Sequence, residues 1–272
     1  METMSLTYSE DRLPAEVLNA TLGSDAPHHQ VEALRLEGRL QMILPELEPT
    51  FGMAQNHYHF GTVWEHTLKA LEVVSDETDD LTLRLATLLH DMGKPLARTV
   101  DSNGTVHFLH HDAMGSDLAR VVLHRLGYND DITEEVAFII LHHMTTKDWG
   151  NRCEAMKEKS LRKLQYACGT RSRFDRLLTV IHADNMAHAE QWCMPEQVGC
   201  IAAITDEMVA EGSAMFGFQP WMTDLEIKAM KGLEDDGQVK ECQDYMLKLA
   251  FARPLMDRET AIRHLKGYRL TL

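Results

Sequence analysis

The chain has little of what several classes of protein need. Its longest strongly apolar run, residues 136–141, is far too short to cross a bilayer, and no apolar segment follows basic residues near Met1. We therefore expect no membrane span and no secretion signal. The five cysteines include no CxxC pair, so we expect neither a disulfide framework nor a zinc knuckle. Dispersed thiols of this kind are typical of a cytoplasmic protein.

Positive charge is also scarce. The chain has 27 Lys and Arg residues against 42 Asp and Glu residues, which gives a formal net charge of −15 at pH 7. This balance disfavours long nucleic acid as a partner, because such binding needs a broad basic face. One local basic stretch, residues 157–163, is the exception. The charge still allows a small phosphate ester, held by a metal and a few local cations.

Apolar residues recur at helical spacing along most of the 272 residues, which predicts an all-α fold. The expected helices cover residues 14–22, 29–47, 63–75, 81–92, 111–126, 132–144, 157–168, 173–190, 195–212, 223–232, 238–251 and 257–266. Thr62 and Glu65 have the spacing of a capping box at the start of the third helix. Two β-prone runs around Asn103 and Gly104 predict one small hairpin over residues 99–108. We expect a variable arm at 1–28, a helical core at 29–192, and a helical extension at 193–272 packed on that core.

Residues 89–95 place a histidine beside a carboxylate at the end of an apolar helix. Imidazole nitrogen and carboxylate oxygen together suit divalent Zn, Mn, Fe, Co or Ni. An ionised Asp91 among so many leucines is costly without a cation or hydrogen bonds. Asp184 repeats the pattern, because it follows the apolar residues 177–181 on another predicted helix. A single His-Asp pair arises easily by chance, so His90 and Asp91 alone do not establish a metal site.

Further histidines strengthen this interpretation. His66 lies near the start of a predicted helix, where a neutral core histidine is the plain alternative. Histidine doublets at residues 110–111 and 142–143 lie on two more helices. Their occurrence together, with each member on a predicted helix, favours ligands that converge on one bundle core. The residues alone leave open which member of each doublet faces inward.

These motifs resemble the HD superfamily of metal-dependent phosphohydrolases. More narrowly, residues 40–190 resemble the HD domain of bacterial tRNA nucleotidyltransferases, the CCA-adding enzymes. The likeness rests on residues 44–48, 58–59, 63–68, 88–98, 101, 104, 108–115, 126, 143–144, 161–162 and 183–184. Beyond about residue 195 the likeness to that family's helical tail is weak. The nucleotidyltransferase head, with its Gly-Ser motif and paired aspartates, has no counterpart here, so we do not expect nucleotide addition to RNA.

The resemblance implies an HD-domain helical bundle with a metal site. It selects His111 and His143 from their doublets and makes Asp91 the bridging carboxylate. The implied ligands are His66, His90, Asp91, His111, His143 and Asp184. One or two divalent ions, Mn, Fe, Ni, Co, Mg or Zn, would occupy the site.

The implied reaction is hydrolysis of a phosphomonoester or phosphodiester of a nucleotide-like substrate. Two cations near each other activate water and hold phosphate oxygens. Asp91 would orient or deprotonate that water, and Lys94, about one turn further on, would neutralise phosphate charge or bond Asp91. Weaker candidates for substrate contact are His59, Arg98 and Arg162, because arginine suits phosphate and each of the three is otherwise an ordinary surface residue.

Two rival functions are retained. One is a nucleotide phosphohydrolase of another HD type, acting on mononucleotides or dinucleoside polyphosphates. The other is a non-catalytic helical module that binds a metal or nucleotide for regulation, or that docks RNA or a protein. A damaged ligand set would favour the second, and here the set is complete in sequence.

Overall fold

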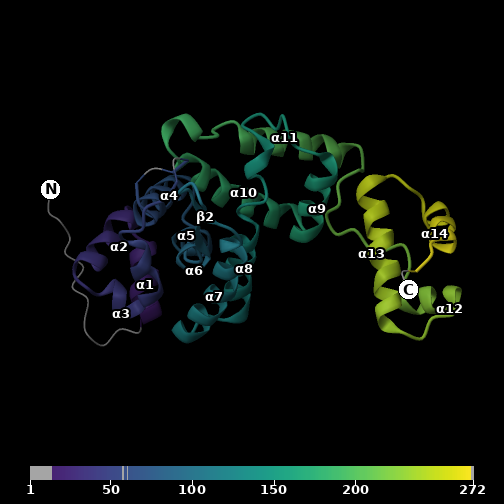
Figure 1. The fold of residues 1–272 in the computed structure, drawn as a ribbon, viewed down its shortest axis with the longest axis horizontal. Helices are drawn as coiled ribbons and strands as arrows, with labels where there is room; N and C mark the ends of the chain where they lie inside the picture. Colours follow the sequence, from purple (N-terminus) through teal and green to yellow (C-terminus); the bar gives the residue numbers. More distant parts are fainter. Residues whose placement is uncertain (1–13, 57, 60, 271–272) are drawn as a thin grey trace. The chain divides into compact units, whose positions relative to one another are not determined.

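The computed structural model describes residues 14–56, 58–59 and 61–270, so the first 13 residues of the predicted arm lie outside it. Over these ranges the chain is mostly helical, with one small two-stranded antiparallel sheet, as predicted (Figure 1).

The α-helices before residue 150 are α1 (Pro14–Leu22), α2 (Pro27–Leu36), α3 (Leu40–Ile43), α4 (Val63–Glu77), α5 (Leu81–Leu89), α6 (Lys94–Ala97), α7 (His111–Leu126) and α8 (Asp130–His142). Those after it are α9 (Glu158–Cys168), α10 (Arg171–Met186), α11 (Gln197–Ala210), α12 (Asp224–Lys231), α13 (Asp236–Ala252) and α14 (Arg258–Gly267). Short 3-10 helices are η1 (Pro45–Thr50), η2 (Lys147–Trp149) and η3 (Glu190–Trp192).

The helix predicted over residues 29–47 is wrong as a single element. Its place is taken by α2, α3 and η1. Gly38 has φ +72°, a left-handed conformation that ends α2, and Pro45 cannot donate the hydrogen bond that would continue α3. The other predicted helices agree with the structure to within four residues at each end.

The helix α1 packs into the fold. Leu18 and Leu22 are buried, Arg84 of α5 donates to the Leu22 carbonyl at 2.8 Å, and the Tyr128 hydroxyl donates to Asn19 Oδ1 at 2.6 Å. Hydrogen bonds therefore tie α1 to residues that follow much later in the chain.

The capping box at the start of α4 is present. The Thr62 hydroxyl accepts from the backbone N–H of Glu65, and the Glu65 carboxylate accepts from the backbone N–H of Thr62. The predicted hairpin is also confirmed: β1 (Arg98–Val100) pairs with β2 (Val106–Phe108), with Arg98 opposite Phe108. The two strands lead from α6 into α7.

The chain divides into two compact units. The first unit comprises residues 1–147 and 176–198, and the second comprises 148–175 and 199–272. The second unit thus includes α9, which lies within the predicted core range 29–192. The predicted domain limits stay a prediction.

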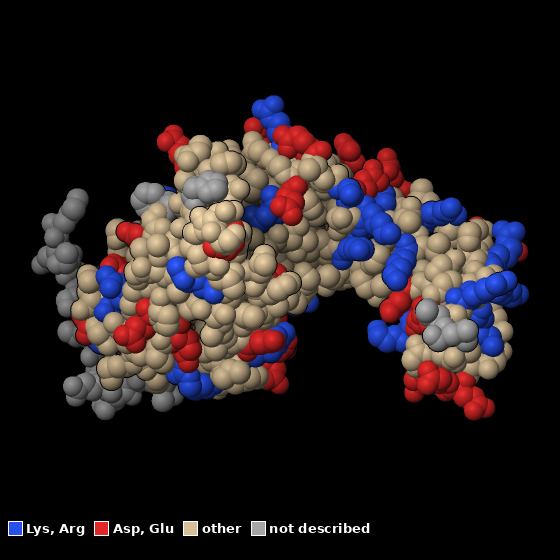
Figure 2. Space-filling model, viewed as in Figure 1, with Lys and Arg blue, Asp and Glu red and all other residues tan. Residues whose placement is uncertain are grey.

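The two units differ in charge. Of the 27 basic and 42 acidic residues, the second unit contains 16 of each, so the net charge of −15 belongs to the first unit. Figure 2 shows a group of Lys and Arg side chains on the viewed face over the region of α9, whose N-cap Lys157 and first turns make up the basic stretch 157–163. Among the described helices, none has both the length and the apolar character that a bilayer crossing requires.

Candidate metal centre

The centre is built around a tight turn after α5. This helix ends at Leu89, three residues earlier than predicted, and His90 is its C-cap. The following turn is closed by i→i−3 bonds, from the Met92 N–H to the Leu89 carbonyl and from the Lys94 N–H to the Asp91 carbonyl. His90 and Asp91 therefore sit where the chain leaves the helix.

Gly93 lets this turn lie against α7. A Cβ at this position would lie 2.1 Å from the His111 carbonyl oxygen and 2.6 Å from the Gly115 nitrogen. No side chain fits in that space. The glycine therefore brings the His90–Asp91 turn next to the helix that carries His111.

The first group of ligating side chains is His66, His90 and Asp184, which come from α4, the end of α5 and α10. His66 Nε2 lies 3.3 Å from His90 Nε2 and 3.0 Å from Asp184 Oδ1. His90 Nε2 lies 3.8 Å from the same Asp184 oxygen. All three residues are buried.

The second group is Asp91, His111 and His143. His111 Nε2 lies 3.3 Å from His143 Nε2 and 3.4 Å from Asp91 Oδ1. The other Asp91 oxygen, Oδ2, lies 3.2 Å from His90 Nε2. Asp91 therefore faces both groups, one oxygen to each. Within each group the ligand atoms all lie within 4.8 Å of one another.

Each of the four imidazoles is oriented by a backbone carbonyl. The Nδ1 atoms of His66, His90, His111 and His143 lie 3.0, 2.7, 2.7 and 2.6 Å from the carbonyl oxygens of Ala187, Thr87, Phe108 and Ile140. We infer that each Nδ1 carries the proton and donates it, which leaves the Nε2 lone pair directed at the centre. Two pairs of such nitrogens then face each other at 3.3 Å. Facing lone pairs repel unless a cation or proton lies between them, so the donor set fits a metal.

Two lysines approach the carboxylates. Lys94 Nζ lies 2.7 Å from Asp91 Oδ2, and Lys147 Nζ lies 2.8 Å from Asp184 Oδ2. Neither contact has hydrogen-bonding geometry, so both carboxylate oxygens are buried without a hydrogen-bond donor in the described part of the chain. Buried carboxylate oxygens of this kind are free to ligate.

Both carboxylates are held in the ionised form. Burial opposes ionisation of Asp91, but the charges of His90 and Lys94 outweigh it, and the pKa of the carboxyl lies well below its usual value. Burial likewise opposes ionisation of Asp184, and the charge of Lys147 contributes most to holding its pKa well below the usual value.

The imidazoles differ in the direction of their pKa shifts. Burial, with the nearby His111, lowers the pKa of His143 to about 3, and burial also lowers the pKa of His66. Burial opposes protonation of His90, but the charge of Asp91 and its hydrogen bond, together with Asp184 and the Thr87 carbonyl, outweigh it, so the pKa of His90 is raised. His66 and His143 are therefore neutral at pH 7, as a metal ligand must be.

A cavity of about 210 Å³ opens over the centre. Its lining includes side chains from both ligand groups, both lysines and the hairpin: Asn56, His59, Asp91, Lys94, His107, Phe108, Leu109, His111, Met144, Lys147 and Asp184. The acids in this lining are the two ligand aspartates, and each is paired with a lysine. Of the eleven described residues in this lining, five are lysines or histidines, and both acids are paired with a lysine, which suits an anion.

The structure brings together all six predicted ligands. It also separates the doublets: His111 is buried in the second group and His143 is fully buried, whereas His110 is exposed and His142 is half-buried. His110 has φ 62° and precedes the first residue of α7, so its side chain is directed away from the helix interior.

The residues predicted to contact substrate lie in different places relative to the cavity. His59 lines the cavity, where its Nδ1 lies 2.9 Å from Asn56 Oδ1 and its Nε2 lies 3.3 Å from Lys94 Nζ. Burial, followed by the charge of Lys94, lowers the pKa of His59 to about 2. Arg98 is exposed at the first residue of β1 and is not among the described residues that line the cavity.

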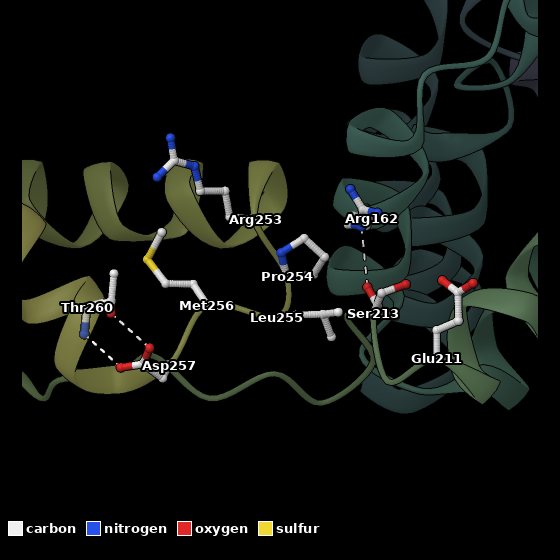
Figure 3. A pocket seen from close by; sticks show the side chains of 9 residues that line it. All are labelled: Arg162, Glu211, Ser213, Arg253, Pro254, Leu255, Met256, Asp257 and Thr260. Atoms are coloured by element: carbon white, nitrogen blue, oxygen red, sulfur yellow. Dashed lines mark hydrogen bonds between the residues drawn. The ribbon is translucent and has the colours of Figure 1, made fainter.

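Arg162 belongs to the second unit. Its guanidinium donates to the carbonyls of Ser213 and Phe251 at 3.3 and 3.2 Å and to Glu158 at 2.6 Å. Figure 3 shows Arg162 directed at Ser213 beside a pocket of that unit. These contacts are structural, and its predicted contact with substrate stays a prediction.

Sequence reasoning missed several residues at the centre. Lys147 contacts Asp184 and also donates to Asn185 Oδ1 at 2.9 Å, and Gln55 accepts from Lys94 at 2.6 Å. The His188 ring lies 5.4 Å from the His66 ring. Lys147 and Gln55 lie outside the α-helices, so no helical periodicity marks them. His188 lies four residues after Asp184, and that spacing was the feature of the sequence that could have identified it.

Comparison with known proteins gives a consistent result. Residues 58–184 match the family described as HD domain. The CC-adding tRNA nucleotidyltransferase of Thermus thermophilus is 38% identical over 110 residues, which is 39% of this chain and 25% of the relative. The A-adding tRNA nucleotidyltransferase of Deinococcus radiodurans is 37% identical over 131 residues, 47% of this chain and 30% of the relative. The bifunctional uridylyltransferase/uridylyl-removing enzyme of Ruegeria pomeroyi is 27% identical over 184 residues, 60% of this chain and 19% of the relative. This chain therefore spans well under half the length of these relatives.

Proposed function

Residues 58–184 of this chain are an HD domain, and from that premise we propose that the protein is a metal-dependent phosphohydrolase. Its proposed substrate is a phosphomonoester or phosphodiester of a nucleotide-like molecule. One observation carries the proposal: four buried imidazoles, each oriented by a main-chain carbonyl, turn their Nε2 atoms toward two buried carboxylates. Structural burial alone does not require that convergence.

The proposed ligands form two positions. His66, His90 and Asp184 would hold one divalent ion, His111 and His143 would hold a second, and Asp91 would serve both. Mixed nitrogen and oxygen donors suit Mn, Fe, Co, Ni or Zn better than Mg, which prefers oxygen. A divalent ion in such a site supplies a Lewis acid that polarises phosphoryl oxygens and activates water for attack.

The chain's own residues would do the rest. Lys94 and Lys147 face the cavity from two sides and would bind the phosphate oxygens, because each ammonium is freed when a metal takes over its carboxylate. Asp91, with its pKa held low, would orient the attacking water and accept a hydrogen bond from it.

A nucleotide-like substrate is supported by the relatives. Two are named as tRNA nucleotidyltransferases and one as a uridylyl-removing enzyme. We extend to this chain only the chemistry that these names share, a phosphate ester of a nucleotide.

The test joins metal content to turnover. Protein purified without chelator or histidine tag should contain about one to two divalent ions per chain. Asp91→Ala should abolish metal-dependent hydrolysis while leaving the helical content measured by circular dichroism nearly intact. Asp117→Ala is the matched control, because Asp117 is an exposed helical carboxylate paired with Arg120, and it should leave turnover unchanged.

Two results would count against the proposal. Unchanged turnover in Asp91→Ala would remove the mechanism. Metal bound with no turnover across a panel of mononucleotides, dinucleoside polyphosphates and cyclic or linear phosphodiesters would favour the regulatory module instead.

A further inference from the structure

The β1–β2 hairpin places a second histidine–aspartate pair at the cavity. His107 of β2 lines the cavity together with Asp91 and Lys94. Its Nε2 lies 3.1 Å from Oδ2 of Asp101, which follows β1. The pair is separate from the two ligand groups.

Asp101 is fixed in place by the turn. Its Oδ1 accepts from the backbone N–H of Asn103 at 2.8 Å and of Thr105 at 2.9 Å. Its Oδ2 is left for His107, and the hydrogen bond from His107 is the main reason that the pKa of Asp101 is lowered. One carboxylate oxygen therefore holds the hairpin while the other orients the imidazole.

Phosphate ester hydrolysis needs a proton at the leaving oxygen when the leaving group is a poor one. Among the described residues that line the cavity, most titratable groups are unsuited to that task. Asp91, His111 and Asp184 are proposed ligands. Lys94 and Lys147 are the groups assigned to the phosphate oxygens.

His59 is excluded by its contacts. Its Nε2 accepts from the Lys94 ammonium and its Nδ1 is occupied by Asn56, so it holds no proton that it can release into the cavity. Among the described imidazoles that line the cavity, His107 is therefore the one with a nitrogen held by a carboxylate outside the ligand groups.

On the basis of the proposed function, we propose that His107 is the general acid of the reaction and that Asp101 is its positioning residue. Water attacks phosphorus, keeps one proton as the new P–OH group and releases the other to solvent, and the bond from phosphorus to the leaving oxygen breaks. The leaving oxygen takes the bond's electron pair and accepts the proton from the His107 imidazolium. The neutral imidazole regains a proton from solvent at the open side of the cavity. The carboxylate of Asp101 sets the orientation of the His107 ring, as the third group does in other acid–base pairs.

Two substrates separate this role from a structural one. p-Nitrophenyl phosphate has a leaving group that departs without a proton, whereas the alkyl ester of a nucleoside 5′-monophosphate requires one. His107→Gln should lower kcat/KM for the nucleotide about 100-fold or more and for p-nitrophenyl phosphate less than about threefold. Asp101→Asn should show the same selectivity with a smaller loss, because the asparagine oxygen can still hold the turn.

His124→Gln is the matched control. His124 is an exposed histidine of α7 that lies 3.8 Å from Asp130 of α8, and its replacement should change the turnover of neither substrate. Equal losses for the two substrates in His107→Gln, or no loss for either, would overturn the assignment of the general acid. Failure of the metal-loaded wild-type protein to hydrolyse any phosphate ester of the panel described for the proposed function would overturn that function itself, which is a distinct result.

Discussion

The two units differ in the kind of side chain that they bury. The first unit buries eight ionisable side chains in its described part: His66, Arg84, His90, Asp91, Lys94, His111, His143 and Asp184. The second unit buries an apolar cluster of Met222, Ile227, Val239, Cys242, Met246, Ala261 and Leu265, and its one buried ionisable side chain in the described residues, apart from thiols, is Arg162.

This difference in buried side chains affects the stability of the two units in opposite ways. A buried charge costs several kcal/mol unless partners compensate it, whereas buried apolar area stabilises directly. Arg162 is compensated by two carbonyls and Glu158. Asp91 and Asp184 keep an oxygen without a hydrogen-bond donor, so the first unit is expected to depend on a cation in a way that the second does not.

The largest effect is expected from a glycine of the first unit. Gly93→Ala should cost more than about 3 kcal/mol and abolish metal binding, because the added methyl group would meet the backbone of α7. Gly199→Ala is the matched change in the second unit, where nothing lies within 4 Å of the new Cβ. It should be neutral or stabilise by about 0.5 kcal/mol. Denaturant unfolding and metal analysis measure both, and equal costs would refute the contrast.

Truncation of a side chain in the apolar cluster tests the comparison from the second unit. Ile227→Ala should destabilise the second unit by about 3 kcal/mol, because it leaves a cavity among fully buried side chains. Bound metal per chain should not change. A parallel loss of metal would show that the two units do not behave independently.

Removal of the metal should change the unfolding temperature of the first unit and leave that of the second unit unchanged. Chelation should lower the unfolding temperature of the first unit, since a metal at about 100 times its Kd stabilises by about 2.7 kcal/mol. The transition of the second unit should stay in place. Calorimetry of the apo and reconstituted protein measures this, and equal shifts of both transitions would contradict it.

The smallest effect concerns an ion pair near the surface of the first unit. Hydrogen bonding to Glu77 raises the pKa of His182 above 6.5, against the opposing effect of burial. The pair therefore stabilises the fold below the unfolded pKa of His182 and loses that contribution as pH rises through the higher folded value. The loss should be under about 1 kcal/mol, because the pair is partly exposed. His182→Gln should remove this pH-dependent difference in metal-loaded protein, and an unchanged pH profile would argue against the pair.

Much of the fold could be predicted from residues that are close together in the sequence. Only part of the site could be predicted in this way. The capping box at Thr62 and the turn at Asn103–Gly104 are decided by residues within a few positions of each other, whereas α5 ends at Leu89, three residues before its predicted end. Lys147 and His107 reach the cavity only through tertiary packing, so nothing in their own neighbourhood marks them. The break at Gly38 was missed because the apolar spacing continues across it.

The main-chain anchoring of the four imidazoles has a consequence for redesign. Because carbonyls of Thr87, Phe108, Ile140 and Ala187 set the tautomer, amino-acid exchange at those anchoring positions leaves the acceptor atom in place. Leu109 and Met144, two apolar residues of the cavity lining outside the ligand groups, could then be varied without changing those acceptor atoms. If the proposed function holds, the donor set and the choice of substrate depend on different residues of the lining.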